Sequence, residues 1–569
     1  MKEKIKVVII GGVACGAKTA ARLARICPQA DITILERGED LSYANCGFPF
    51  LLGGEVKSQD SLTHTGFGVE RNSDYFESYA LTKALTGHEV TSIDRASKNV
   101  TVRIKSTGET VIFPYDKLVI STGASPIIPN IPGISLKNVF TLWTLKDALA
   151  VNGALINSNI NRAVVVGAGL VGMETAEALK NRGIDVSIID ALPLPLSTIS
   201  EEEFGVLIRK ELENNGIKFY GEEKLIEIQG DEFVSCVVTN SRKIETDLVV
   251  ISVGVRPNLA LAKSAGLSIG ERAILINSNM RTSDPDIYAG GDSVECLNFI
   301  TGKHVWQPMG STANRHGRVI ADNIAGLRSE FTGVGGTSIV RVFNYSVGKT
   351  GLTFKSAEEA GFHPIEMLTA NTDIPGFMPG SSFLLIKLLA DTKTRRLLGA
   401  QMIGTGKIDK RLDVIATAIK GNLTIDALAD TDLAYSPPYA TALDPVTHAA
   451  NSMKNKIDGL IKSLPPSELK LKGERGDDFI ILDVRNSGEI NRFGKLEYDG
   501  LNIPLGELDA RACELPKDKE IILVCKSAIR AWIAYSILLR HGCSNMAVLE
   551  GGMVSWGYDF KFPTGKLLT

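Results

Sequence analysis

The stretch VVIIGGVACG, from Val7 to Gly16, decides the fold of the first part of the chain. Its apolar start is typical of a buried parallel strand, and its glycines lead into an alanine-rich helix. Glycines at such a turn let backbone N–H groups approach a pyrophosphate at a helix N-terminus. Val13 replaces the second glycine of the usual fingerprint, but Glu36, at the end of the next expected strand, supplies the acidic ribose ligand. The stretch therefore predicts a dinucleotide-binding fold.

The same pattern returns, complete, in VVVGAGLVG, from Val164 to Gly172. A second apolar run, 186–189, then ends in Asp190. A carboxylate at this place accepts a hydrogen bond from a ribose 2′-hydroxyl and repels a 2′-phosphate, which favours NADH over NADPH. A solvated aspartate at a strand end is the alternative interpretation of Asp190.

Two similar segments, ISTGASP (120–126) and ISVGVRP (251–257), predict paired strand-to-loop crossings between the two nucleotide folds. The second fold is then inserted into the first. The segment DIYAGGD, from Asp286 to Asp292, resembles the FAD signature of a flavoprotein family: a strand that ends in glycines and an aspartate expected to point at the ribityl chain. With this motif, the first 450 residues resemble the two-dinucleotide flavoprotein disulfide reductases.

Composition excludes several classes of protein. A chain of 569 residues is too long for one hydrophobic core and predicts several domains. Its formal charge of −3 is spread along the chain, so we expect neither nucleic acid nor an anionic membrane as a partner. The eight cysteines form no C-x-x-C motif and no paired metal-ligand spacing, so we expect no metal site and a reducing, cytoplasmic location. No apolar run approaches the roughly 20 residues of a membrane helix.

Cys46, in YANCGFP (43–49), is the first candidate redox residue. Flavin disulfide reductases of the usual kind carry a second cysteine a few positions on, but Leu51 stands there in this chain. A redox-active Cys46 must therefore form its disulfide with a thiol from outside. The setting Asn-Cys-Gly-x-Pro resembles coenzyme A disulfide reductases and the single-cysteine NADH oxidases and peroxidases. The opening GGVAxG favours the coenzyme A group, and Ala14 occupies the position of the catalytic histidine of the peroxidases.

The segment LAYSPPY (433–439), followed by Asp444, resembles the dimerisation motif of this family. The resemblance implies a homodimer in which Tyr435 reaches the active cysteine of the partner subunit as a hydrogen-bond donor or acid. A tyrosine that only caps a turn before two prolines is the alternative. The family's Tyr-Tyr-Pro-Gly appears here as FMPG (377–380), so a second tyrosine contact is missing.

The resemblance also implies residues that bind coenzyme A. Arg22 matches a position that serves the phosphates, and Ser42 and Asn45 match the loop that lines the pantetheine arm. A solvated charge on a helix face is the alternative interpretation of Arg22. Extra residues around 66–87, relative to the familiar pattern, leave other phosphate contacts unassigned.

The end of the chain predicts a separate module. The segments IILDVR (480–485), NIPL (502–505) and LEGGMVSW (549–556) alternate with helical patterns and resemble a single-domain rhodanese over its full length. We expect Cys525 to follow a strand and to open the loop CKSAIR, whose N–H groups and following helix would cradle a persulfide. Arg530 adds positive charge.

Two residues depart from the usual rhodanese loop: Ala528 replaces its glycine, and Ala531 replaces its Ser or Thr. Both put thiosulfate specificity in doubt. A structural cysteine after a strand, and a degenerate rhodanese that only docks partners, are the alternatives for this module.

The predicted fold class is α/β, with two Rossmann-like dinucleotide-binding domains, an α+β dimerisation domain and a small α/β rhodanese domain. The expected boundaries are 1–113 and 246–326 for the FAD domain, 114–245 for the NAD(H) domain, 327–452 for the dimerisation domain, 453–470 for a linker and 471–569 for the rhodanese. The expected cofactor-binding residues for FAD and NADH are Gly11, Gly12, Val13, Ala14, Gly16, Glu36, Arg37, Thr122, Gly123, Asp292, Gly167, Gly169, Gly172, Asp190 and Gly254.

Together these features predict an NADH-dependent flavoprotein that reduces coenzyme A persulfide, polysulfide or coenzyme A disulfide through Cys46, while Cys525 transfers sulfane sulfur. Its expected partners are small thiol and persulfide substrates. Two alternatives remain open: an NADH oxidase that cycles through a sulfenic acid on Cys46, and a redox sensor or docking protein that uses the rhodanese for contacts.

Overall fold

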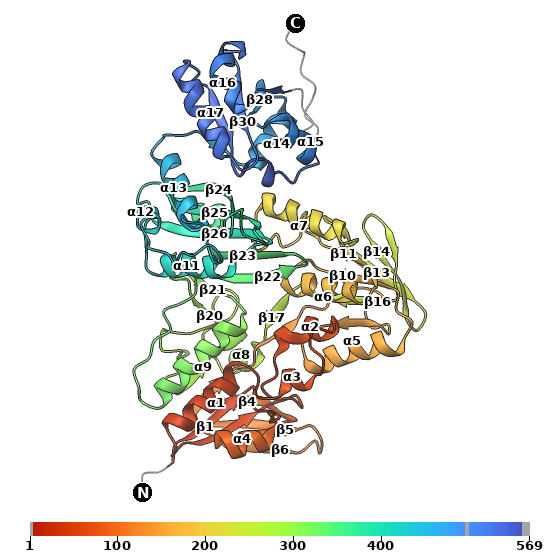
Figure 1. Cartoon of the computed structure of the whole chain (residues 1–569). Coiled ribbons are helices and arrows are strands. Elements are labelled where there is room, and N and C mark those ends of the chain that lie inside the picture. Colours follow the sequence, from red (N-terminus) through yellow and green to blue (C-terminus); the bar gives the residue numbers. More distant parts are fainter. Residues whose placement is uncertain (1–3, 495–499, 560–569) are drawn as a thin grey trace. The chain divides into compact units, whose positions relative to one another are not determined.

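The computed structural model describes residues 4–494 and 500–559, and the chain forms two compact units (Figure 1). Unit 1 comprises residues 1–191 and 220–334. Unit 2 comprises residues 192–219 and 335–569. Within the described part of the chain, no helix has the length and apolar character needed to cross a membrane.

The first sheet of unit 1 is parallel, in the order β19-β7-β1-β2-β3. Its strands are β1 (Lys6–Ile10), β2 (Asp31–Leu35), β3 (Lys83–Leu85), β7 (Lys117–Ile120) and β19 (Ile287–Ala289). The central strand is apolar because it is covered on both faces, and its residues 7–10 are at most 5% exposed. Helix α1 (Cys15–Ile26) follows β1 and lies along α9 (Gly310–Ile324) (Figure 1).

A second parallel sheet in unit 1 contains β11-β10-β16-β9 as neighbours. Its strands are β9 (Val139–Thr141), β10 (Arg162–Val166), β11 (Asp185–Ile189) and β16 (Leu248–Ile251), and α6 (Leu170–Asn181) follows β10. The chain passes between the sheets along β8 (Ala124–Pro126) and β17 (Val255–Pro257), which form an antiparallel pair. The two Rossmann-like folds and the paired crossings match the prediction from sequence.

Three small sheets complete unit 1, two of them antiparallel and one mixed. They are β4 (His88–Asp94), β5 (Asn99–Ile104) and β6 (Thr110–Pro114); β13 (Leu225–Gly230), β14 (Val234–Thr239) and β15 (Lys243–Glu245); and β20 (Val294–Leu297) with β21 (His304–Val305), where β18 (Ile274–Leu275) joins β20 in parallel.

Unit 2 begins with a five-stranded antiparallel sheet in the order β22-β23-β26-β25-β24. Its strands are β22 (Ser338–Val342), β23 (Tyr345–Gly351), β24 (Pro364–Thr372), β25 (Phe383–Asp391) and β26 (Leu397–Gly404). Helices α7 (Glu202–Asn214), α11 (Asp409–Lys420), α12 (Ile425–Ala429) and α13 (Pro445–Ile457) accompany it. Strand β24 is therefore an edge strand of this sheet.

The C-terminal sheet of unit 2 is parallel, in the order β27-β31-β30-β28-β29. Its strands are β27 (Ser463–Leu464), β28 (Phe479–Asp483), β29 (Leu501–Asn502), β30 (Glu520–Val524) and β31 (Met546–Leu549). Its helices are α14 (Pro466–Arg475), α15 (Ser487–Phe493), α16 (Leu505–Arg511) and α17 (Ile529–Arg540). With it the predicted α/β class and the order of the four folds are confirmed.

The stretch 453–470, expected to be a linker, is mostly regular structure. Helix α13 continues to Ile457, β27 begins at Ser463, and α14 begins at Pro466. Its polar residues are exposed faces of helices, and proline fits the first turn of a helix because its missing N–H has no partner there anyway. The irregular connection between α13, beside the antiparallel sheet, and β27, in the C-terminal sheet, is therefore residues 458–462.

Candidate active site

The first glycine loop leaves no room for side chains. Gly11 has a φ of +98°, and a Cβ added to it would lie 2.3 Å from the Ser121 carbonyl oxygen. A Cβ on Gly16 would lie 1.8 Å from the Gly11 carbonyl oxygen. The loop can therefore bring its backbone close to a pyrophosphate, with Val13 and Ala14 at the start of α1.

Glu36 is held by two backbone donors. Its Oε2 accepts a hydrogen bond from the Gly12 N–H and its Oε1 from the Gly38 N–H, both at 2.7 Å. Glu36 lies at the end of β2, where a dinucleotide fold binds a ribose, and Arg37 beside it is exposed. This arrangement fits the adenosine half of FAD.

Asp292 lies in a short 3-10 helix, Gly291–Ser293, directly after β19. Burial raises the pKa of its carboxyl to about 6, as expected for a carboxyl placed to meet a polar ligand in a desolvated site. The Trp306 indole N–H donates to the Asp292 carbonyl oxygen at 2.8 Å. The Gly291 N–H donates to Nδ1 of His316, a fully buried residue on α9, at 3.2 Å. These groups fix the loop that presents Asp292.

The two crossings between the nucleotide folds carry three further residues predicted to bind a cofactor: Thr122, Gly123 and Gly254. The Thr122 hydroxyl donates to the Asn258 carbonyl oxygen at 2.9 Å, and the Asn258 side-chain amide donates back to the Thr122 carbonyl oxygen at 2.8 Å. Gly123 and Gly254, one in each crossing, have φ of +62° and +98°, which L side chains rarely adopt. The two crossings are therefore joined to each other by hydrogen bonds, at the segments where the sequence predicted them.

Cys46 lies in the 3-10 turn Asn45–Gly47 and is exposed. Its thiol donates to the Asn45 side-chain oxygen at 3.7 Å. The Ser42 N–H donates to the Gly12 carbonyl oxygen at 3.0 Å, which ties the cysteine loop directly to the first glycine loop. The structure therefore brings Ser42, Asn45 and Cys46 together beside the predicted flavin site.

Two opposing electrostatic influences act on Cys46. Desolvation of the sulfur, followed by the negative charge of Glu174, raises the pKa of the thiol. The N-terminus of α9 lies close by, since a Cβ on Gly310 would be 4.0 Å from the Cys46 sulfur. The positive end of that helix dipole favours a thiolate.

Arg22, predicted to contact coenzyme A phosphates, is half-buried and paired. Its Nε lies 2.9 Å from Oδ1 of Asp322 on α9, and its side chain is 23% exposed. Arg22 is thus not a solvated charge on a helix face. Its role as a phosphate ligand stays a prediction.

The second glycine loop repeats the geometry of the first. Gly167 has a φ of +104°, and its Cβ would lie 2.3 Å from the Ser252 carbonyl oxygen. A Cβ on Gly172 would lie 1.9 Å from the Gly167 carbonyl oxygen, and Gly169 caps α6. Oδ2 of Asp190 accepts from the Ala168 N–H at 2.5 Å, as Glu36 accepts from its own loop. The residues fit a second dinucleotide, the pyridine nucleotide.

Tyr435 lies in unit 2, in the loop between α12 and α13, and is 55% exposed. Buried Arg411 fixes the end of this loop through two contacts with Asp444, at 3.0 and 2.9 Å. Phe377 and Tyr439 are 77% and 63% exposed. Large exposed aromatic side chains on one unit are typical of an interaction surface.

Cys525 directly follows β30 and is only 1% exposed. Its carbonyl oxygen accepts from the Met553 N–H at 2.9 Å. A Cβ on Gly552, which has a φ of +58°, would lie 2.5 Å from the same oxygen. Ala528 has a φ of +69°, so it adopts the left-handed conformation that the usual glycine favours.

Arg530 is paired with Glu489, a residue that the sequence analysis did not identify. Its Nη1 and Nη2 donate to Oε2 and Oε1 of Glu489 at 2.6 and 2.7 Å. The ion pair raises the pKa of Arg530 and lowers that of Glu489. Glu489 also forms a capping box with Asn486 at the start of α15. The pattern Asn-x-x-Glu before a helix was the one local sequence signal that pointed to Glu489.

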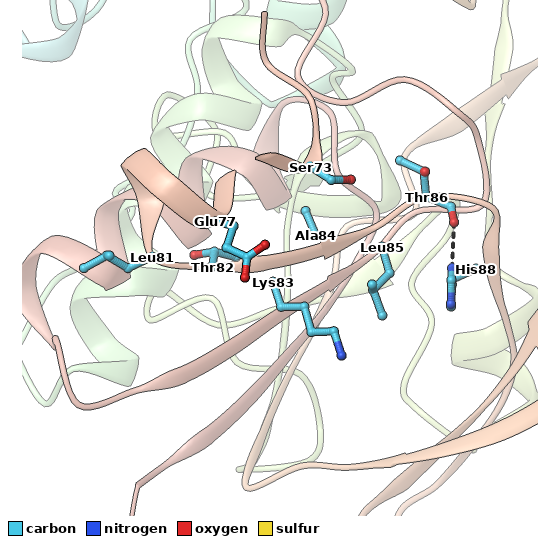
Figure 2. A pocket seen from close by; sticks show the side chains of 9 residues that line it. All are labelled: Ser73, Glu77, Leu81, Thr82, Lys83, Ala84, Leu85, Thr86 and His88. Carbon is cyan, nitrogen blue, oxygen red and sulfur yellow. Dashed lines mark hydrogen bonds between the residues drawn. The ribbon is translucent and has the colours of Figure 1, made fainter. Parts of the chain in front are cut away.

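A surface pocket of about 540 Å³ lies elsewhere, beside edge strand β3 and helix α4 (Ser73–Ala80) (Figure 2). Its lining residues are Ser73, Glu77, Leu81, Thr82, Lys83, Ala84, Leu85, Thr86 and His88. None of them is a predicted site residue.

Three family models match the chain in the order of the folds. Residues 5–314 match the pyridine nucleotide-disulphide oxidoreductase model, residues 337–446 its dimerisation domain, and residues 465–559 the rhodanese-like domain. The NAD(P)H sulfur oxidoreductase (CoA-dependent) of Pyrococcus furiosus is 36% identical over 79% of this chain and all of its own length.

Two solved structures cover almost the whole chain. An NAD-dependent persulfide reductase from A. fulgidus is 38% identical, with a TM-score of 0.92 over 97% of this chain and 100% of its own. The reduced CoADR-RHD of Bacillus anthracis is 34% identical, with a TM-score of 0.91 over 97% of this chain and 98% of its own. The chain therefore belongs to the pyridine nucleotide-disulphide oxidoreductase family and is an oxidoreductase with a dimerisation domain and a C-terminal rhodanese domain.

Proposed function

We propose that this chain is an NAD(P)H-dependent flavoprotein that reduces coenzyme A persulfide, polysulfide or coenzyme A disulfide, with NADH as its preferred donor. One observation carries the proposal: Cys46 is exposed and lies beside the first glycine loop, where FAD is expected. It forms no disulfide within the chain, and neither do the other seven cysteines. Such a thiol needs a partner from solution, and coenzyme A is named in the relative from Pyrococcus furiosus.

Two groups of residues would bind the two cofactors. Glu36, Asp292 and the first glycine loop would hold FAD, and the loop with Asp190 would hold the pyridine nucleotide. Bound FAD supplies a two-electron link between the nicotinamide and a sulfur pair. The carboxylate of Asp190 discriminates against a 2′-phosphate, which is the basis of the NADH preference.

Cys46 performs the sulfur step. Its thiolate attacks the sulfur attached to coenzyme A, forming the Cys46–S–S–coenzyme A bond and breaking the bond to the outer sulfur or thiol. Hydrosulfide leaves from a persulfide, and coenzyme A thiolate leaves from the disulfide. Two electrons then return both sulfurs of the mixed disulfide to thiolates. Asn45, as the acceptor of the thiol, orients the sulfur before attack.

Cys525 would load sulfane sulfur before the reduction. The loop after β30 is followed by α17, so consecutive N–H groups and the helix N-terminus suit a persulfide anion. Because Glu489 balances Arg530, the loop carries less net charge than an unpaired arginine would give it. This is a physical reason for weak selection of the thiosulfate dianion.

A homodimer completes the proposal. The match to the dimerisation domain and the exposed Tyr435 support a site shared between two copies, with Tyr435 beside the cysteine of the partner subunit. A cytoplasmic location stays a prediction from cysteine usage.

The NADH oxidase remains the second candidate because an exposed, unpaired Cys46 also suits a sulfenic acid. The experiment that decides is an anaerobic titration with NADH, followed by coenzyme A persulfide, polysulfide and coenzyme A disulfide in turn. The reductase reoxidises with these acceptors under argon, whereas an oxidase reoxidises only when oxygen is admitted. A sensor or docking protein turns over with none of them.

A further inference from the structure

The edge strand of the dimerisation sheet is covered by side chains instead of another strand. The Leu368 N–H on β24 donates to Oε2 of Glu550 at 2.8 Å. The Glu366 carbonyl oxygen, on the same strand, accepts from Nζ of Lys456 at 2.9 Å. Exposed edge strands carry unpaired backbone groups that proteins cover by such devices. Glu550 belongs to the rhodanese domain, so this domain covers the edge.

Glu550 is completely buried, and both of its carboxylate oxygens have polar partners. Its Oε1 forms an ion pair with Nζ of Lys456 and accepts from the Ser463 hydroxyl at 2.7 Å. Lys456 lies on α13, and Ser463 lies on the first rhodanese strand. A buried carboxylate is stable only when it is paired and hydrogen-bonded, so these partners hold Glu550 in place.

The segment after Glu550 holds the sulfur loop. The Met553 N–H donates to the Cys525 carbonyl oxygen at 2.9 Å, and the Val554 N–H donates to the Lys526 carbonyl oxygen at 3.1 Å. Nζ of Lys526 lies 4.8 Å from the ring centroid of Phe383, the first residue of β25. One short stretch of chain thus contacts both the dimerisation sheet and the Cys525 loop.

A second anchor lies nearby. Lys387 on β25 is 5% exposed and forms ion pairs with Glu201, Glu203 and Glu366 at 2.6, 3.0 and 3.2 Å. The Ser467 hydroxyl of the rhodanese helix α14 donates to Glu203. Two polar anchors and the short connection 458–462 leave the domain little freedom to swing.

We propose that Glu550 is a positioning residue: it locks the rhodanese domain onto β24, so that Cys525 is presented from one fixed place on the dimerisation domain. The lock itself is a structural proposal, whereas the presentation of Cys525 rests on the sulfur-transfer role proposed above. Since the domain is fixed, sulfur leaves on the small molecule. The coenzyme A thiolate attacks the outer sulfur of the Cys525 persulfide, the bond between the two persulfide sulfurs breaks, and Cys525 departs as a thiolate.

The test measures docking and turnover in the same full-length holoenzyme. In Glu550→Ala, the Leu368 N–H and Lys456 lose their partner, so amide hydrogen exchange in a peptide covering 364–372 should accelerate about tenfold. Reduction of polysulfide with catalytic coenzyme A should fall about tenfold, while reduction of coenzyme A disulfide stays unchanged. Glu550→Gln keeps an acceptor for Leu368 and should restore most of the protection.

Two further variants make the test independent of folding. Lys456→Met removes the same ion pair from the other domain, and protected amides in β30 report in the same data that the rhodanese is folded. Glu514→Ala removes an exposed glutamate of the rhodanese and serves as the matched control.

The outcomes separate the two proposals. Wild-type exchange in β24 for both Glu550→Ala and Lys456→Met overturns the lock, whatever the turnover. Faster exchange with an unchanged polysulfide rate overturns the positioning role. A wild-type enzyme that reduces no sulfur acceptor overturns the proposed function, yet the exchange data still decide on the lock.

Discussion

The two cysteines that we propose to be functional, Cys46 and Cys525, occupy opposite kinds of site. Cys46 is exposed and lies in a short turn, where its thiol donates to the side chain of the neighbouring Asn45. Cys525 is 1% exposed and is framed by Gly552, Met553 and the rest of its own loop. The protein encloses Cys525 with its own residues, whereas in our proposal a coenzyme A thiol completes the site of Cys46. The difference fits the two proposed roles: Cys46 would have to meet a bulky thiol, and Cys525 would have to hold a small sulfane sulfur.

The largest effect is expected at the open site. Cys46→Ser should lower acceptor reduction by on the order of 10³-fold or more, because our proposal assigns the mixed disulfide to this thiol alone. Flavin reduction by NADH, followed by absorbance under argon, should remain close to wild type. A variant with normal persulfide or disulfide turnover would show that Cys46 is not the redox residue.

Loss of the enclosed thiol, Cys525, should slow the reduction only of those sulfur donors that must first transfer sulfur to it. Cys525→Ser is expected to slow polysulfide reduction on the order of 100-fold, since no thiolate accepts the outer sulfur. Coenzyme A disulfide should be reduced at the wild-type rate in the same assay. Equal rates for variant and wild type with every donor would remove the rhodanese from the reductive path.

A smaller effect is expected from the exposed tyrosine. Tyr435→Phe removes a hydroxyl while keeping the ring, so acceptor reduction should slow roughly tenfold and flavin reduction much less. Stopped-flow measurement of the two half-reactions separates these rates. Tyr439→Phe, on the same exposed loop, is the matched control. Light scattering that finds a fully active monomer would refute the shared site.

Alkylation compares the cysteines directly. The pKa of the Cys46 thiol is raised above that of an ordinary thiol. Only the thiolate reacts with iodoacetamide, so the labelling rate should rise about tenfold per pH unit until the pH reaches this raised pKa. Peptide mapping of the reduced enzyme should show Cys46 labelled well before enclosed Cys525. Labelling of Cys46 that is already independent of pH at neutrality would contradict the raised pKa.

The smallest effect is on stability. Ala528 has a φ of +69°, which costs an alanine about 1 kcal/mol, so Ala528→Gly should stabilise the rhodanese by about 0.5–1 kcal/mol. Thermal unfolding of the full chain, followed through rhodanese amides by hydrogen exchange, measures this. Destabilisation would show that the loop does not strain its alanine.

Residues with local spacing could be predicted from the sequence. The glycine loops, Glu36 and Asp190 could be identified because a strand, a turn and a helix fix their distances along the chain. The structure places each carboxylate against its glycine loop, and the binding of ribose stays a prediction. The linker could not be predicted, because a polar composition describes the exposed face of a helix as well as it describes a connection.

Residues that act across long sequence separations left no such signal. His316 meets the Asp292 loop from α9, and Glu550 reaches β24 from the rhodanese. Neither lies in a spacing that predicts its partner, since the partners come together only in the folded sheets. The same limit applies to Arg22, whose partner Asp322 is on another helix.

The central claim is that Cys46 forms its disulfide with coenzyme A. The most direct measurement takes enzyme in which Cys46 is reduced and the flavin is oxidised, treats it with one equivalent of coenzyme A disulfide under argon, and maps the adduct by peptide mass spectrometry. The account predicts one coenzyme A on Cys46, one coenzyme A thiol released, and complete loss of the adduct after one equivalent of NADH. An adduct on another cysteine, or one on Cys46 that NADH does not remove, would contradict it.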